Sequence, residues 1–423
     1  MTYNGKPPLD EPVQIEKELP HSSLSARLGE LASLFVKLGT ISFGGPAAHV
    51  ALIQEEIVRR RQWVTQQQFL DMLGAANLIP GPTSTEIAIN VGFLRAGWAG
   101  LCVAGASFIL PAATITGAFA WAYVRFGSFP QASSILEGIK AAVIAVIAIA
   151  IWRLGKSAVR DAGLALLGVL AAGAFFLGLN PIAILFGGGL IGMLVRRTVS
   201  LRAAAATLVS NVFPLRALTS SAWKNMRIAP LRSTGLIASA SVAAGTVAGR
   251  PTIGRIALFF LKVGAVLYGG GYVLLAFLEQ GLVQQHAWLT RQQLLDAVAI
   301  GQFTPGPVLS TATFIGYILG GVPGAAVATI GIFLPSFFYV ALLAPVLFRL
   351  RKSPWIAAFL DSVNVCAVAL MAGVTFQLAS DALRGWTTWA VALVSLAILL
   401  RRKVSPAWIV LGGGIVGLLA LGR

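Results

Sequence analysis

Long apolar runs without a single charged residue dominate the chain. Three of them cover residues 96–124, 162–195 and 297–348. A membrane-spanning helix needs about 20 mostly apolar residues, so the last two runs must each hold more than one crossing or a partial one. A transmembrane β-barrel would alternate apolar and polar positions, and these runs do not alternate. The pattern therefore predicts an all-α polytopic membrane protein.

One stretch occurs twice in the chain, as residues 34–111 and again as residues 259–335. Each copy has a lysine seven residues before a glycine pair, then Trp-x-Thr-x-Gln-Gln-x-Leu-Asp, and then Pro-Gly-Pro nine residues further on. An offset of 225 aligns these features, and 15 of the 46 positions from Lys37 to Pro82 match their counterparts. Two copies of one interrupted unit are the arrangement expected of a secondary transporter.

Both copies are predicted to break inside apolar sequence. The breaks carry the glycines Gly44, Gly45, Gly269 and Gly270, and Pro46 follows the first pair. Glycine lowers the cost of leaving helical geometry, and proline removes a backbone donor. Unpaired backbone groups at membrane depth are tolerated only where protein or a water-filled cavity satisfies them. A simple kink is the plain alternative, but recurrence in both copies favours a functional break.

Each Pro-Gly-Pro triplet is predicted to start a helix. The triplets are Pro80-Gly81-Pro82 and Pro305-Gly306-Pro307. Proline suits the first helical position because its missing N–H would be unpaired there anyway. Residues 83–93 are too few to cross the membrane, so we expect a half-helix that returns from a re-entrant loop. The free amides of its first turn and the positive end of the helix dipole would make an anion site.

Basic residues lie at the ends of apolar runs, and their placement reverses between the two copies. The basic run 59–61 aligns with the uncharged run 284–286, whereas the single Arg125 aligns with the basic run 349–352. Basic loops mark the cytoplasmic side, so the copies are predicted to form inverted-topology repeats. The predicted organisation is a cytoplasmic polar tail (1–27), a first repeat (28–195), a basic linker (196–250) and a second, inverted repeat (251–423). Whether residues 235–249 cross the membrane is left open.

Composition removes other classes of protein. Charged residues make up 11% of the chain, against about 25% in a soluble domain. The net charge of +17 lies at the ends of apolar runs, which argues against nucleic acid as a partner. The two cysteines lie far apart, and the three histidines show no ligand spacing, so we expect no disulfide, metal or other cofactor.

The candidate substrate site lies where the two helix starts meet. In inverted repeats both starts point toward the midplane, so amides from Gly81 to Thr85 and from Gly306 to Ser310 would converge on a small oxyanion. Further donors would come from the hydroxyls of Thr83, Ser84, Thr85, Thr304, Ser310 and Thr311. Lys37 and Lys262, buried in the broken helices, would neutralise the anion. Snorkelling is the alternative for the lysines, and helix packing the alternative for the hydroxyls.

Glu86 is the predicted proton-coupling residue. It lies one turn into the first half-helix, and its counterpart in the second copy is Thr311. An ionisable group at membrane depth is costly and usually functional. A carboxylate beside an anion site repels the substrate unless it is protonated, which indicates coupling to protons. Glu55 is a weaker candidate for the same role.

Two further pairs of charged residues are expected to be structural. Asp71 and Asp296 occupy aligned positions on the amphipathic helices, where they would cap or pair. Glu137 and Lys140 are three residues apart, so they are expected to pair with each other on one helix face. Thr65 and Thr290 stand where N-caps would start the amphipathic helices.

With these motifs together, the sequence resembles the chromate ion transporter family of the long, two-domain type. The resemblance covers nearly the whole chain after the tail and rests on Phe43-Gly44-Gly45-Pro46, Pro80-Gly81-Pro82, Tyr268-Gly269-Gly270-Gly271-Tyr272 and Thr304-Pro305-Gly306-Pro307. It implies efflux of chromate across the inner (plasma) membrane, driven by the proton gradient and giving chromate resistance. It also implies two homologous halves of opposite orientation.

Other readings stay open at this point. Residue chemistry reaches only an oxyanion, and sulfate has the shape and charge of chromate. An anion channel could use the same helix ends without coupling to protons. A membrane enzyme acting on anionic lipid headgroups is less favoured, because no nucleophile–base pair, metal cluster or nucleotide motif occurs in the sequence. A homodimer is compatible with all of these readings.

Overall fold

The computed structural model describes residues 23–43, 46–76, 79–127, 129–195, 251–268, 273–343, 353–401 and 404–421. Within these ranges the chain is helical, with short connections and no strand, which confirms the all-α prediction. Among the described residues, four helices are long and apolar enough to cross a membrane: Thr83–Phe126, Ser133–Ala158, Val308–Leu342 and Trp355–Ala382. Four shorter apolar helices are Ala162–Phe176, Pro181–Val195, Trp386–Arg401 and Pro406–Ala420.

The helices follow the same order in both repeats. The first repeat consists of α1 (Leu24–Ile41), α2 (Pro46–Gln54), the π-helical η1 (Glu55–Arg60), α3 (Gln66–Ala76), α4 (Thr83–Phe126), α5 (Pro130–Ala158), α6 (Ala162–Phe176) and the helix Pro181–Val195. The second consists of α8 (Ile253–Val266), α9 (Leu274–Leu278), the π-helical η2 (Glu279–Gln285), α10 (Arg291–Phe303), the 3₁₀ turn η3 (Val308–Ser310), α11 (Thr311–Leu343), α13 (Pro354–Ala382), α14 (Trp386–Arg401) and α15 (Pro406–Leu421).

Local geometry recurs at aligned positions as well. The turns before α3 and α10 place a non-glycine residue at positive φ, Gln62 at 52° and Ala287 at 50°. The helices that follow begin with a capping box, in which Thr65 pairs with Gln68 and Thr290 with Gln293. Both predicted N-caps are confirmed. Matching turns and caps show that the two sequence copies fold into the same structural unit.

The predicted half-helix is present in both repeats. Inside α4 the backbone leaves helical geometry at Ala96 and Gly97, where Gly97 has a φ of 60°, and α11 does the same at Gly320 and Gly321. After the first kink the chain doubles back so closely that a Cβ on Gly92 would overlap the carbonyl of Gly100. Each Pro-Gly-Pro triplet is therefore followed by a short helix that returns along the next span.

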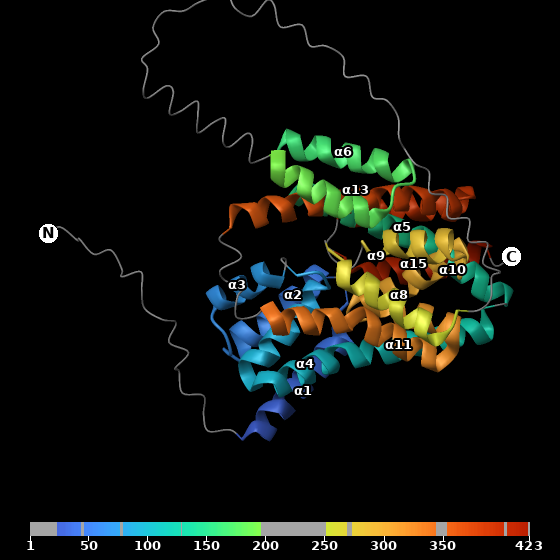
Figure 1. The fold of residues 1–423 in the computed structure, drawn as a ribbon. Coiled ribbons are helices and arrows are strands. Elements are labelled where there is room, and N and C mark those ends of the chain that lie inside the picture. Colours follow the sequence, from blue (N-terminus) through green and yellow to red (C-terminus); the bar gives the residue numbers. More distant parts are fainter. Residues whose placement is uncertain are drawn as a thin grey trace, which may run out of the picture.

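Helices α1 and α8 pack in the same way on α4 and α11. A Cβ on Gly39 would overlap the carbonyl of Phe108, and a Cβ on Gly264 would overlap the carbonyl of Ile332. Helices α4 and α11 also contact each other, so the two repeats meet along their kinked helices. Figure 1 shows α1, α4, α11 and α8 together on one side of the molecule, with α6 and α13 on the other side and α10 between.

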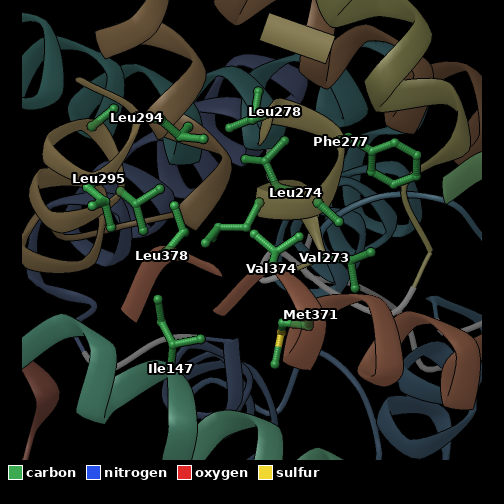
Figure 2. Close-up of a cluster of buried hydrophobic side chains, with 14 of the residues drawn as sticks. Ile147, Val273, Leu274, Phe277, Leu278, Leu294, Leu295, Met371, Val374 and Leu378 are labelled. Atoms are coloured by element: carbon green, nitrogen blue, oxygen red, sulfur yellow. The ribbon is translucent and has the colours of Figure 1, made fainter. Parts of the chain in front are cut away.

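One apolar core joins the two repeats. Figure 2 shows Ile147 of α5, from the first repeat, in one cluster with residues of α9, α10 and α13 from the second. Leu274 and Leu278 of α9 and Leu378 of α13 are almost completely buried there. Because these side chains are buried against the other repeat, the two units are packed together as one body.

Candidate functional site

The two Pro-Gly-Pro turns are buried, and each is hydrogen-bonded to the opposite repeat. The N–H of Gly81 donates to the carbonyl of Leu267 (2.8 Å), and the N–H of Gly306 donates to the carbonyl of Ser42 (2.9 Å). Ser42 and Leu267 are aligned residues at the ends of α1 and α8, where each repeat breaks. A contact that is made twice, with the roles of the repeats exchanged, is the mark of two-fold symmetry. Both helix starts therefore lie at the boundary between the repeats.

Glycine is required at the centre of both turns. Gly81 has a φ of 144° and Gly306 a φ of 87°, in the region that side chains rarely adopt. There is also no room for a side chain. A Cβ on Gly81 would overlap Ser336 Oγ and Glu86 Oε1, and one on Gly306 would lie 2.6 Å from Ala112 Cβ. The sequence motif thus reflects both backbone conformation and close approach of the other repeat.

Fewer backbone amides are free at the two helix starts than the sequence predicts. The amides of Gly81 and Gly306 are used across the repeats, and those of Thr85 and Ser310 bond back to Pro82 and Pro307. In the described chain this leaves the amides of Thr83 and Ser84, and those of Val308 and Leu309, as the donors of each first turn. The amides of Gly81 and Gly306 are not free because each helix start packs on the other repeat and donates a hydrogen bond to it.

Hydroxyl groups differ between the two helix starts. In the second repeat, Thr304 donates to the carbonyl of Ile300 (2.7 Å) and Thr311 to the carbonyl of Val308 (2.8 Å). Ser310 accepts from Thr116 of α4 (3.2 Å). In the first repeat, Thr85 Oγ1 is buried without a hydrogen-bond partner among the described residues. The first helix start therefore offers the unused hydroxyl.

Unsatisfied polar atoms gather beside the first helix start. Glu86 is completely buried, and neither of its carboxylate oxygens has a hydrogen-bond partner in the described chain. Ser336 Oγ, from α11 of the second repeat, is likewise buried and unpartnered. Glu86 Oε1 and Ser336 Oγ both lie against Gly81. We call Gly81, Thr85, Glu86 and Ser336 the Gly81 cluster, and native proteins rarely leave such a group unpaired without a functional reason.

A smaller group of this kind lies beside the second helix start. His49 Nε2 is 3.1 Å from the carbonyl of Ser42, the same oxygen that accepts from Gly306. His49 Nδ1 and Ser42 Oγ are buried and have no partner among the described residues. Sequence reasoning weighed His49 only as a metal ligand and passed over Ser336. A signal for Ser336 existed, because it follows Pro335, the counterpart of Pro111 in the repeat.

The two lysines are exposed, so the prediction that they are buried is wrong. Lys37 keeps about half of its side chain exposed (49%) and its Nζ lies 2.9 Å from Glu56 Oε1. Lys262 is also exposed, on the outer side of α8. The hydrogen bond from Lys37 holds the pKa of Glu56 below its ordinary value, so this carboxylate stays charged. Glu55 is 40% exposed and pairs with Arg59 (3.3 Å).

The buried charge on the inner side of α5 has an unexpected partner. Lys140 is buried and its Nζ lies 3.3 Å from Asp296 Oδ1 in the second repeat, whereas Glu137 is exposed. The predicted Glu137–Lys140 pair is therefore wrong. Asp296 also accepts a hydrogen bond from the hydroxyl of Tyr123 (2.8 Å). The carboxylate of Asp71 accepts a hydrogen bond from Gln67 of its own helix (3.2 Å), which agrees with the predicted local role.

Some predicted positions lie outside the described residues. These are the break glycines Gly44, Gly45, Gly269 and Gly270, most of the tail 1–27, and the linker that includes residues 235–249. An apolar cavity of about 480 Å³ lies between α4, α5, α10 and α15, lined by residues such as Phe119, Ile139 and Leu411. It has no charged lining residue, so it does not suit a dianion.

Comparison with known proteins agrees with this arrangement. The family model described as "Chromate transporter" matches twice, at residues 29–193 and 254–418. A chromate transport protein of Cupriavidus metallidurans is 33% identical over 404 residues, covering 95% of each chain. A chromate transport protein of Pseudomonas aeruginosa is 29% identical and covers 92% of this chain and 91% of its own length.

A shorter relative matches one part of the chain. An uncharacterized transporter of Bacillus subtilis is 29% identical over 154 residues, which is 86% of its own length but 36% of this chain. A protein of about one repeat in length is thus similar to part of this two-repeat chain. No solved structure matches the chain.

Proposed function

The chain belongs to the chromate transporter family, and on this basis we propose that it exports chromate across the inner membrane in exchange for protons and so confers chromate resistance. It is a multi-pass membrane protein and a transporter rather than an enzyme. Direction, coupling and resistance are the proposed parts. The observation that best supports a substrate site between the repeats is that both helix starts are buried there, each hydrogen-bonded to the other repeat.

The proposed substrate site is formed by the two helix starts. Chromate is a small tetrahedral dianion, and helix N-termini bind such anions through backbone amides and the positive end of the dipole. The amides of Thr83 and Ser84, with the hydroxyl of Thr85, would be donors in the first repeat. Val308 and Leu309 would supply the matching amides in the second. The break glycines lie outside the described residues and are included in the proposed site because of their sequence motif. Lys37 and Lys262 are exposed and are not included.

The repeats are proposed to be inverted in the membrane, with the N-terminal tail in the cytoplasm. Loop charges support the inversion, and the reciprocal bonds of Gly81 and Gly306 supply the two-fold relation that it requires. In inverted-repeat transporters the substrate site lies near the midplane at the interface of the repeats. Rocking of one repeat against the other would then open the helix starts to each side in turn.

Glu86 is the proposed proton-coupling residue of this site. Its carboxylate is completely buried within the Gly81 cluster, close to donors that chromate would use. When charged it repels a dianion and competes for those donors, and when protonated it becomes a donor itself. Proton and chromate occupancy are therefore linked at this cluster. A channel without coupling would have no need of a buried acid at this point.

Uptake into everted membrane vesicles tests the proposal. Radiolabelled chromate should accumulate when the vesicle interior is made acidic, and a protonophore should abolish the accumulation. Uptake that needs no pH gradient would identify a channel, and uptake driven by the opposite gradient would overturn the export direction. Unlabelled sulfate and unlabelled chromate, each in excess, compare the two anions, because stronger competition by sulfate would make sulfate the preferred anion.

A further inference from the structure

The pair formed by Lys140 and Asp296 is the most deeply buried ion pair of the described chain. Its side chains are 4% and 3% exposed, and it joins α5 of the first repeat to α10 of the second. Lys140 is also the only buried lysine or arginine among the described residues. Taking two charges out of water is costly, and replacement by apolar residues often stabilises a protein. Such a pair therefore calls for a reason other than stability.

Asp296 has few other charged neighbours. From α4 it meets the hydroxyl of Tyr123, and from α5 it meets Lys140. Arg291, at the start of its own helix, is occupied by Glu279 of η2 (2.9 Å) and Asp381 of α13 (3.0 Å). Helices α11 and α15, which also pack on α10, contain no charged residue. Lys140 has no second ion pair among the described residues, so the charge state of Asp296 decides whether it has a counter-ion.

One face of α4 connects this pair to the second helix start. Along that face, Ala112 lies against Gly306, Thr116 bonds to Ser310, and Tyr123 bonds to Asp296. Eleven residues separate Ala112 from Tyr123, about 16 Å at the helical rise of 1.5 Å per residue. Helix α4 is continuous between these contacts, so it links the surroundings of Asp296 to the contact at Gly306.

The pair breaks the symmetry of the two repeats. Asp296 has a counterpart in Asp71, but the position of Lys140 is taken by Asn364 in the second repeat. A carrier made of two similar halves alternates between two states that exchange the roles of the halves. An ion pair on one side alone stabilises one of those states over the other.

We propose that Asp296 is a second proton-binding site, and that its pair with Lys140 is a latch between the repeats. With Asp296 charged, the latch holds α5 to α10. When a proton binds the carboxylate, the attraction is lost and Lys140 becomes a buried cation without a counter-ion, so the contact opens and the repeats change state. The inference rests on the proposed proton-coupled transport, to which it adds the step that couples proton binding to movement.

A distance measurement between α5 and α10 tests the latch without any substrate. Spin labels are placed at the exposed positions 137 and 292, by Glu137→Cys and Gln292→Cys, after Cys102→Ser and Cys366→Ala. In lipid nanodiscs, acidification should shift the distance distribution of the otherwise native chain. Asp296→Asn should show the acidic distribution at every pH, and the matched control Asp71→Asn should keep the native shift. An Asp296→Asn variant with the native pH response overturns the proposal.

A double variant separates a latch from a purely structural pair. Lys140→Gln with Asp296→Asn leaves no lone buried charge, so it is expected to assemble even where a single variant does not. The latch predicts chromate uptake that has lost its stimulation by the pH gradient. Native gradient-driven uptake by the double variant contradicts the latch and leaves the proposed function intact. Absence of uptake by the native protein would instead refute the proposed function, while the distance measurement still decides on the latch.

Discussion

Gly81→Ala addresses the helix start directly, because two independent costs act on one methyl group. The φ of 144° is a strained conformation for alanine, at about 1–3 kcal/mol. The methyl group would also overlap Ser336 Oγ and Glu86 Oε1, and making room in a packed interior costs about 1–3 kcal/mol more. The total of about 2–6 kcal/mol is less than or comparable to the stability of a typical domain, about 5–15 kcal/mol.

The expected outcome is a protein that still assembles but no longer transports. The turn can relieve its strain by moving away from α11, which would break the bond to Leu267 and displace the first-turn amides from the site. Gly81→Ala is therefore expected to lose gradient-driven chromate uptake in everted vesicles, while its amount in the membrane stays near that of the native protein. Thermal unfolding in detergent would show a lowered Tm.

Two matched variants separate the site from general backbone effects. Gly178 has a φ of 81° but open space around it, so Gly178→Ala carries strain alone, about 1–2 kcal/mol. Gly173 lies in α6 with ordinary helical geometry and open space, so Gly173→Ala is expected to be neutral or slightly stabilising. Both should transport normally. Native uptake by Gly81→Ala, with the two controls also active, would refute the requirement for this helix start.

Three further predictions concern the acid, the lysine and the hairpin. Glu86→Gln is expected to weaken the dependence of uptake on the pH gradient, because one of the two proposed proton-binding groups is lost. Glu55→Gln, at an exposed ion pair, should keep the native dependence. Equal pH dependence in both variants would remove Glu86 from the mechanism. Lys37→Met should leave the chromate concentration for half-maximal uptake unchanged and alter stability by about 0–1 kcal/mol, since the Lys37 side chain is half exposed and Glu56 keeps its ion pair with Arg60. A tenfold weaker half-saturation would return Lys37 to the site. Gly92→Ala should lower the Tm, at a cost of about 1–3 kcal/mol, because its methyl would overlap the carbonyl of Gly100. Gly316→Ala should lower it for the same reason, through the carbonyl of Gly324. An unchanged Tm in both variants would contradict the close packing of each half-helix on the span that follows it.

Local features of the chain could be predicted from its residues alone. Charge-free runs predicted the helical membrane class, because the length and polarity of a span are properties of one segment. The offset of 225 predicted two similar units, and the capping threonines and the Pro-Gly-Pro helix starts were placed correctly. The caps and helix starts depend on residues within about a dozen positions of one another. Over so short a stretch, spacing in the sequence determines distance in space.

Partners across the repeats could not be predicted in this way. Sequence spacing favoured Glu137 as the partner of Lys140, but the folded chain brings Asp296 to it from 156 residues away. Ser336 and His49 were not predicted as site residues, because only the fold places them beside the helix starts. Lys37 and Lys262 lie beside the breaks in sequence, yet they point outward. Which neighbour a helix face meets depends on how the repeats pack, and many packings satisfy the same apolar pattern, so only the assembled fold reveals it.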